Sequence, residues 1–252
     1  MPRNATALRF QIESSLAGRI NAPFSYCDSP VEEKVSAGSR EADSLSGGLP
    51  RGAITEICGP TSSGRTSLLL AALALRTLAA EACAFIDGRD AFDPYSAQAS
   101  GVRLDQLLWV RCQNIDQALR ATDLVLHAGG FGFVALDLGD IAPEIVNYVS
   151  PSVWFRFRRA VEHTPTIFLV LEQEPHAKSC ASLVLRMEAE TAHWSKTANG
   201  GQDFVPAPQG RLFAGSCLRA EVVRSRGQPV TERPFARGGS TVNLESKYCR
   251  IA

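Results

Sequence analysis

Gly59-Pro-Thr-Ser-Ser-Gly-Arg-Thr-Ser67 is the stretch on which the interpretation of the whole chain depends. It has the G-x-x-x-x-G-K-[ST] spacing of a phosphate-binding P-loop, except that Arg65 stands at the lysine position. A β-rich run, 54–58, precedes it, and a Leu- and Ala-rich segment with helical propensity, 66–80, follows it. Backbone N–H groups of such a loop, together with the helix N-terminus, favour phosphate oxygens. The alternative is a tight turn without a ligand, and this context favours the phosphate loop.

Strand-like and helix-like segments alternate along most of the chain. Short apolar runs typical of buried strands lie at 54–58, 83–87, 107–111, 133–137 and 166–171, and helical segments lie at 66–80, 114–128 and 151–163. The alternation predicts an α/β fold with a mostly parallel central sheet flanked by helices. After residue 180 the helices stop, and two strand patterns, 182–187 and 218–224, predict terminal antiparallel strands.

The composition predicts four parts along the 252 residues. They are an N-terminal amphipathic helix at 1–20, a linker at 21–44, an α/β core at 45–232 and a C-terminal tail at 233–252. In the first part, apolar residues recur four apart from Leu8 to Ile20 and form one stripe, which could pack on the core or mediate self-association. The tail is polar, with weak strand character at 241–244, and is a candidate for ordering on a partner.

Charge and cysteine usage exclude several classes of protein. The formal net charge is zero, although residues 211–252 hold eight Arg or Lys and three Asp or Glu. The seven cysteines form no C-x-x-C pair, which disfavours a zinc site and favours free thiols in the cytoplasm. The N-terminus lacks the apolar region of a signal peptide, and the longest apolar run, Leu68–Leu75, is too short for a membrane span.

The phosphate loop predicts a nucleotide, ATP or ADP, together with Mg²⁺. Thr66 is placed to ligate the metal through its hydroxyl, and Asp137, at the end of an apolar strand, is the natural second ligand. Arginine is a longer planar fork than lysine, so Arg65 favours nucleotide binding over efficient hydrolysis. The predicted nucleotide-binding residues of this region are Gly59, Pro60, Thr61, Ser62, Ser63, Gly64, Arg65, Thr66, Ser67 and Asp137.

Several longer runs resemble a known family. Gly47–Thr66, Cys83–Pro94 and Gly101–Leu108 resemble the first half of the RecA recombinase core. The later pair Ser182–Met187 and Arg219–Arg226 resembles the terminal strands of that family. The motifs occur in the family's order over roughly residues 45–230, which makes the match specific. The resemblance implies a RecA-like P-loop core and use of ATP with Mg²⁺.

The departures from the RecA pattern concern catalysis and DNA binding. In that family a glutamate after the second core strand activates the attacking water, and Arg89 stands at its place here. Arginine accepts no proton at neutral pH, so general-base help is lost unless Asp90 substitutes. Only 174–180 is available where the family has a long DNA-gripping loop. We therefore expect no catalytic residue and no efficient ATPase activity.

Other positions carry over from the family one by one. Gln173 matches its γ-phosphate-sensing glutamine. Asp93 and Tyr95 lie near its adenine-contacting positions, although the family's tyrosine would register with Ser96. Arg224 and Arg226 lie where the family has two lysines that reach a neighbouring subunit's nucleotide. Two outward-facing residues on an edge strand are the alternative for this arginine pair.

A basic aromatic segment lies near the position of the family's first DNA loop. Arg156, Arg158 and Arg159 alternate there with aromatic residues, and such a segment can bind phosphates and stack on bases. The alternative is an amphipathic helix with Trp154 and Phe157 in the core, and the helical spacing favours this alternative.

A short RecA relative with altered catalytic residues and without DNA loops resembles the ImuA family. That resemblance implies a non-catalytic adaptor for translesion synthesis and induced mutagenesis in the bacterial SOS response. The implied partners are an ImuB-like Y-family polymerase homologue, RecA and an error-prone replicative-type polymerase, with DNA contact and nucleoid association after damage. The alternatives are an ATP-dependent single-stranded-DNA-binding recombinase paralogue and a SulA-like cell-division inhibitor. Arg65 and Arg89 disfavour the former, and the phosphate loop disfavours the latter.

Overall fold

The computed structural model describes residues 33–194, 213–226 and 241–247. The expected N-terminal helix and most of the expected tail lie outside these ranges. The helices are α2 (Arg40–Ser46), α3 (Arg65–Leu78), α4 (Pro94–Ala99), α5 (Ile115–Ala128), α6 (Pro143–Asn147) and α7 (Pro151–Val161), with 3₁₀ turns η1 (Leu104–Gln106) and η2 (Lys178–Cys180). The strands are β1 (Lys34–Val35), β2 (Leu49–Pro50), β3 (Ala53–Cys58), β4 (Cys83–Asp87), β5 (Leu107–Arg111), β6 (Phe133–Asp137), β7 (Ile167–Glu172), β8 (Ala181–Trp194), β9 (Phe213–Ser225) and β10 (Thr241–Lys247).

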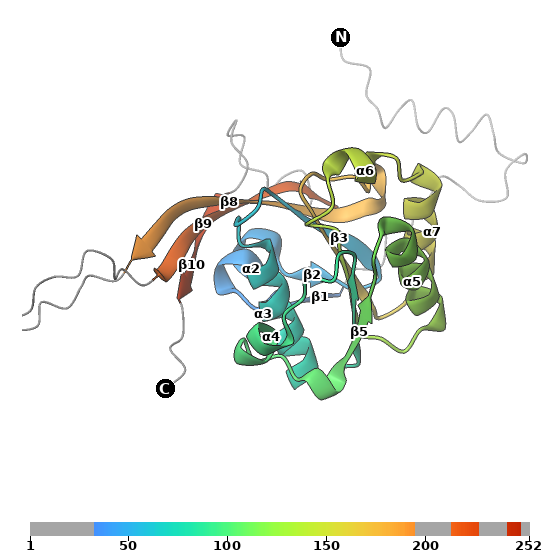
Figure 1. Ribbon diagram of the computed structural model, residues 1–252, viewed down its shortest axis with the longest axis horizontal. Coiled ribbons are helices and arrows are strands. Elements are labelled where there is room, and N and C mark those ends of the chain that lie inside the picture. The colour runs from blue at the N-terminus through green and yellow to red at the C-terminus, as the bar shows by residue number, and fades with distance from the viewer. Residues whose placement is uncertain (1–32, 195–212, 227–240, 248–252) are drawn as a thin grey trace, which may run out of the picture. The chain divides into compact units, whose positions relative to one another are not determined.

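One eight-stranded sheet organises the fold, in the order β10-β9-β8-β3-β7-β6-β4-β5 (Figure 1). The strands from β8 to β5 are parallel, whereas β9 and β10 are antiparallel to their neighbours. The α/β class, the parallel centre and the antiparallel terminal strands are thus confirmed. Because parallel strands end at the same edge, β3, β6 and β7 bring their carboxyl ends together there.

Helices cover both faces of the parallel part of the sheet (Figure 1). On one face, α2, α3 and α4 pack over a core that includes Leu69, Leu73 and Phe85. On the other face, α5 and α7 pack over a second core that includes Phe157 and Phe168, whose rings meet edge to face at 5.7 Å. Such a pair adds about 0.5–1.5 kcal/mol to the burial of the two rings.

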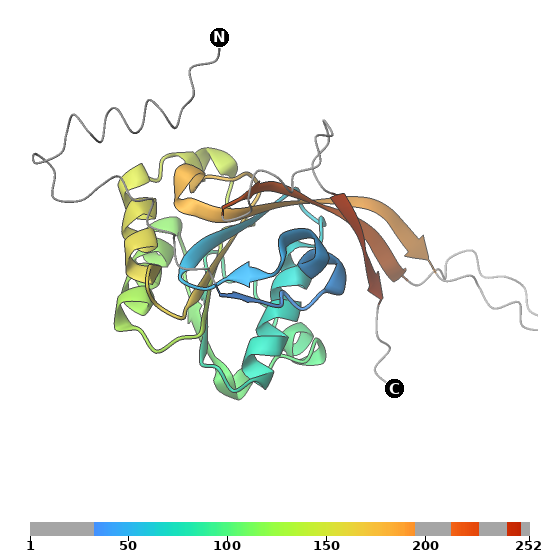
Figure 2. The same ribbon diagram turned by 180° about the vertical axis from the view of Figure 1, so that it is seen from behind.

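The terminal strands extend the sheet, and their far ends project past the helices (Figure 2). β8 runs parallel to β3 and antiparallel to β9, which in turn pairs with β10. α2 contacts both β9 and β10. The weak strand character expected at 241–244 corresponds to β10.

The segment expected to be a linker is structured from Lys34 onwards. β1 pairs with β2, and α2 follows with Ala42 and Leu45 buried in the core. Ser39 caps the start of α2 through its side chain, and Gly47 ends it at a φ of 73°. The short helix has few apolar residues, so its sequence carries only a weak periodic signal.

Two general expectations concern thiols and membranes. Cys58, Cys83, Cys112 and Cys180 are free and buried. Within the described ranges, no helix combines the length and apolar character needed to cross a membrane.

Candidate nucleotide site

The phosphate loop joins β3 to α3 at the carboxyl edge of the sheet. Ser62 and Gly64 both have left-handed backbone, at φ 64° and 87°. α3 then starts at Arg65 without a side-chain cap. The N–H groups of its first turn therefore lack intrahelical partners, and the helix dipole makes this end electropositive. The backbone thus retains the form of an anion cradle.

One side of the loop is pressed against the terminal strands. A Cβ at Gly59 would collide with the carbonyl oxygen of Met187 on β8. A Cβ at Gly64 would collide with the side chain of Leu218 on β9. Ser63 is buried beside Gly59, and its Oγ has no hydrogen-bond partner among the described residues. The terminal strands therefore help to hold the loop in its conformation.

Arg65 turns its guanidinium into the protein. The side chain is only 7% exposed, and Nη1 donates a hydrogen bond to the main-chain carbonyl of Glu172 at the end of β7. Burial lowers the pKa of Arg65, while the charges of Asp137 and Asp140 oppose that shift. Arginine remains protonated in such surroundings. The cation of the loop is thus engaged with the ends of β6 and β7.

Gly139 brings three of the predicted site residues together. Its N–H donates to Asp137 Oδ1 at 2.8 Å, and its carbonyl accepts from Gln173 Nε2 at 3.1 Å. A Cβ at Gly139 would lie 3.1 Å from Arg65 Nη1. The sequence analysis missed this glycine, although it follows Asp137 within two residues. Arg65, Asp137 and Gln173 therefore share one corner of the site.

The metal-ligand prediction rests on Asp137 and Thr66. Burial raises the pKa of Asp137 to about 6, with a smaller contribution from nearby Asp140. Thr66 is exposed in the first turn of α3. In the described part of the chain, no three His, Cys, Asp or Glu side chains form a metal-binding group. A metal here would consequently need ligands from a nucleotide and from water, which is the usual arrangement for Mg²⁺.

The loop after β4 offers no free carboxylate. Asp87 accepts hydrogen bonds from the main-chain N–H groups of Ala91 and Phe92 and from Trp109 Nε1. Asp90 forms a two-pronged pair with Arg111, both distances being 2.6 Å, and these bonds lower its pKa. Arg89 is exposed. Asp90 is thus occupied, and substitution for the missing base is unsupported by this geometry.

The predicted adenine-contacting residues lie at α4. Asp93 is its N-cap, and its carboxylate accepts the main-chain N–H groups of Tyr95 and Ser96. The Tyr95 side chain is 82% exposed. The capping role alone accounts for an aspartate at this position.

The segment after β7 is fixed by a buried cluster that the sequence analysis missed. Glu56 Oε1 accepts the main-chain N–H groups of His176, at 2.8 Å, and of Ala177, at 2.6 Å. His176 Nδ1 lies 2.6 Å from Glu172 Oε2. Both glutamates are fully buried, and burial raises the pKa of each to about 8. The sequence does contain a signal for this cluster, because Glu56 and Glu172 each lie within an otherwise apolar strand.

Two arginines that we expected to reach a neighbouring subunit instead bond to the 174–180 segment of their own chain. Arg224 donates to the carbonyl oxygen of Lys178, and Arg226 donates to that of Ser179. Both guanidinium groups thus bond to this chain's own η2. An arginine bonded to a neutral carbonyl retains an uncompensated positive charge.

The basic aromatic segment forms α7. Trp154 and Phe157 are buried, as the amphipathic alternative requires. Arg156 pairs with Asp123 at 2.7 Å, and Arg158 lies 3.8 Å from Glu162. The third cation, Arg159, is exposed on α7.

Comparison with known proteins agrees with this geometry. The RecA N-terminal domain matches residues 26–144. This part of the chain is similar to the RecA N-terminal domain. Protein RecA of Deinococcus radiodurans is 45% identical over 105 residues, which are 41% of this chain and 29% of that protein. Protein RecA of Psychrobacter cryohalolentis is 42% identical over 105 residues, 41% of this chain and 30% of its own length.

A solved structure extends the likeness of the RecA-like core to the later strands. The crystal structure of the RadB recombinase has a TM-score of 0.56 with 16% sequence identity, and covers 82% of this chain and 94% of its own. At that identity the likeness concerns the fold alone. The chain spans under a third of the length of the curated RecA proteins that it matches.

Proposed function

We propose that the protein is a largely non-catalytic accessory factor of bacterial DNA repair, an adaptor for translesion synthesis built on a RecA-like core. The observation that carries the proposal is that Arg65 and Asp90, which could replace the family's lysine and glutamate, both bond to other groups of the protein. Arg65 is bonded to Glu172, and Asp90 is paired with Arg111. In the described part of the chain, Arg65 and Asp90 are therefore not placed to follow the charge of a transferred phosphoryl group or to activate water.

Nucleotide binding fits the residues better than hydrolysis does. The backbone of Gly59–Gly64 and the start of α3 would hold phosphate oxygens, and Thr66 with Asp137 would complete the surroundings of Mg²⁺. Bound Mg²⁺–nucleotide supplies phosphate anions that the N-terminus of α3 neutralises. Arg65 would have to leave the Glu172 carbonyl to reach them. We therefore assign the site a structural or regulatory use of ATP or ADP.

The segment at 174–180 supports an adaptor rather than a recombinase. It is short, and Glu56 holds its main chain from inside while Arg224 and Arg226 hold it from outside. A loop that grips single-stranded DNA must adapt to its ligand, and this segment is bonded in place instead. The proposed partners are an ImuB-like Y-family polymerase homologue, an error-prone replicative-type polymerase and RecA, in the bacterial cytoplasm.

Affinity purification from DNA-damaged cells tests the proposal. We expect the full chain to co-purify with a Y-family-like polymerase homologue after damage, and the variant Arg65→Ala to retain that partner, because assembly does not require turnover. The matched control is Arg76→Ala on the same helix. Recovery of recombination intermediates on single-stranded DNA without any polymerase subunit would favour a recombinase paralogue instead.

A further inference from the structure

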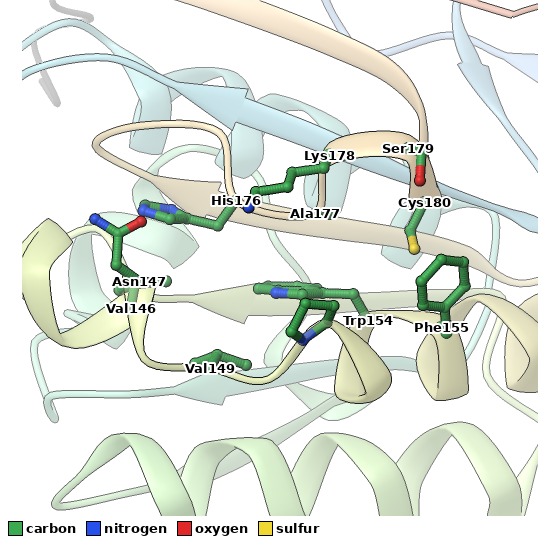
Figure 3. A pocket seen from close by; sticks show the side chains of 11 residues that line it. Val146, Asn147, Val149, Trp154, Phe155, His176, Ala177, Lys178, Ser179 and Cys180 are labelled. Carbon is green, nitrogen blue, oxygen red and sulfur yellow. The ribbon is translucent and has the colours of Figure 1, made fainter.

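A small cavity lies on the face of the protein formed by α6, α7 and the 176–180 segment. Its volume is about 110 Å³, and Trp154, Val149 and Ala177 supply apolar walls. Figure 3 shows the Trp154 indole facing the chain at Ala177, with Cys180 and Phe155 together at one end of the cavity. At the other end Asn147 and His176 point toward one another (Figure 3).

Three exposed large hydrophobic side chains belong to the cavity lining or to its immediate neighbours in sequence. Phe155, which also lines the cavity, is 49% exposed. Ile145 and Tyr148 flank the lining residues Val146 and Asn147 and are 47% and 89% exposed. Single exposed apolar residues are ordinary, but several of them at a cavity with a mixed polar and apolar lining are typical of a binding surface.

Positive charge lies at the Cys180 end of this surface, whereas Glu174 acts on His176 at the other end. Lys178 lines the cavity, and the charges of Arg158 and Arg226 act on the thiol of Cys180 in its wall. Glu162, 3.8 Å from Arg158, offsets part of that charge. Arg226, in contrast, is bonded to the neutral carbonyl of Ser179, so its charge remains available to an anionic partner.

We propose that this surface binds an acidic peptide of a partner protein, which inserts one aliphatic or small aromatic side chain into the cavity. The cavity is somewhat smaller than the ~150 Å³ apolar cavity that accommodates benzene, which suits one side chain rather than a nucleotide. Trp154, only 3% exposed, and Phe157, fully buried, offer no ring face for base stacking. The proposal does not depend on the translesion role.

Peptide selection with a cavity-blocking variant tests the proposal. A random-peptide library is selected on the immobilised full chain and subtracted against Asn147→Trp, which places an indole at the exposed end of α6. We expect the surviving peptides to combine acidic residues with one recurrent Leu, Ile, Met or Phe. Circular dichroism checks that each variant is folded. Survivors that are basic, or that lack a recurrent apolar residue, would overturn the proposal, as would an absence of survivors.

Affinities of a selected peptide then separate shape from charge. By fluorescence anisotropy we expect Phe155→Ala and Lys178→Glu each to weaken binding about tenfold or more. Leu78→Ala and Arg40→Glu, exposed on helices of the opposite face of the sheet, are the matched controls and should leave binding unchanged. Labelled oligothymidylate is the second probe. Tight oligothymidylate binding that Phe155→Ala and Lys178→Glu abolish would assign the surface to nucleic acid and overturn the peptide proposal.

Discussion

The phosphate loop follows β3, and the 174–180 segment follows the neighbouring strand β7. The two regions differ in how the rest of the protein holds them. The phosphate loop has the length of the P-loop motif and left-handed turns at Ser62 and Gly64, but the Arg65 guanidinium bonds to the main-chain carbonyl of Glu172. The 174–180 segment is short. Glu56 accepts its main-chain N–H groups from inside, and Arg224 and Arg226 donate to its carbonyl groups from outside. The phosphate loop thus has the backbone form of an anion cradle, whereas hydrogen bonds to its main chain hold the second segment in place. The proposed adaptor role rests on this difference.

The largest effect should come from disrupting the contact between the phosphate loop and the terminal strands. Gly59 has a φ of 156°, and a Cβ there would meet the carbonyl of Met187 on β8, which is fixed by strand pairing. We expect Gly59→Ala to lower the free energy of unfolding by about 3 kcal/mol or more in urea denaturation. Gly47→Ala, at a φ of 73° in the left-handed helical region and facing only the flexible end of Lys34, should cost about 1–2 kcal/mol. An equal loss of unfolding free energy in the two variants would show that β8 does not hold the loop.

The next effect concerns the inner anchor of the second segment. Glu56→Ala leaves the buried N–H groups of His176 and Ala177 without an acceptor, which should cost about 2–4 kcal/mol. Glu56→Gln keeps an acceptor oxygen and should cost about 1 kcal/mol or less. Hydrogen exchange at the two amides should accelerate in the alanine variant alone. Unchanged protection of these amides would contradict the anchoring role.

The same cluster predicts how stability depends on pH. Burial raises the pKa of Glu56 to about 8 from 4.5, so the folded state keeps a proton that the unfolded chain has lost. The free energy of unfolding should therefore fall as pH rises through that window. Glu172 acts in the same sense, while His176, whose pKa burial lowers, acts against it. Thermal melts should show a flatter pH profile in Glu56→Gln, and a steeper one would contradict the assignment.

A smaller effect should follow from releasing the cation of the phosphate loop. Lysine is a compact charge on a flexible stem, so Arg65→Lys should free the loop for phosphates and raise Mg²⁺–nucleotide affinity about tenfold. Titration with a fluorescent nucleotide measures this. Arg76→Lys, on the same helix and paired with Glu81, is the matched control and should leave the affinity unchanged. Weaker binding by Arg65→Lys would mean that arginine itself contacts the nucleotide.

Much of the fold could be predicted from the sequence because each buried strand is a short apolar run. The strand, glycine loop and helix at 54–80 correspond to β3 and α3, and 133–137 is β6. α2 was missed because only Ala42 and Leu45 mark its buried side. Here tertiary packing decides the structure more than local periodicity does.

The candidate site was less accessible to sequence reasoning. Spacing placed Arg65 in the loop but could not give the direction of its side chain, which depends on the carbonyl of Glu172 at the end of β7. Glu56 and His176 are 120 residues apart and meet only because β3 and β7 are neighbours in the sheet. The roles of Asp93, Tyr95 and Gln173 toward a nucleotide stay predictions.

Steady-state ATP turnover with and without single-stranded DNA tests the central claim most directly. It is measured on the full chain and on the double variant Arg65→Lys/Arg89→Glu. We expect no DNA-stimulated turnover by the natural sequence, and only a small gain in the double variant, because the 174–180 segment stays short and anchored. Turnover by the natural sequence that single-stranded DNA strongly stimulates would contradict the account and identify the protein as a working recombinase.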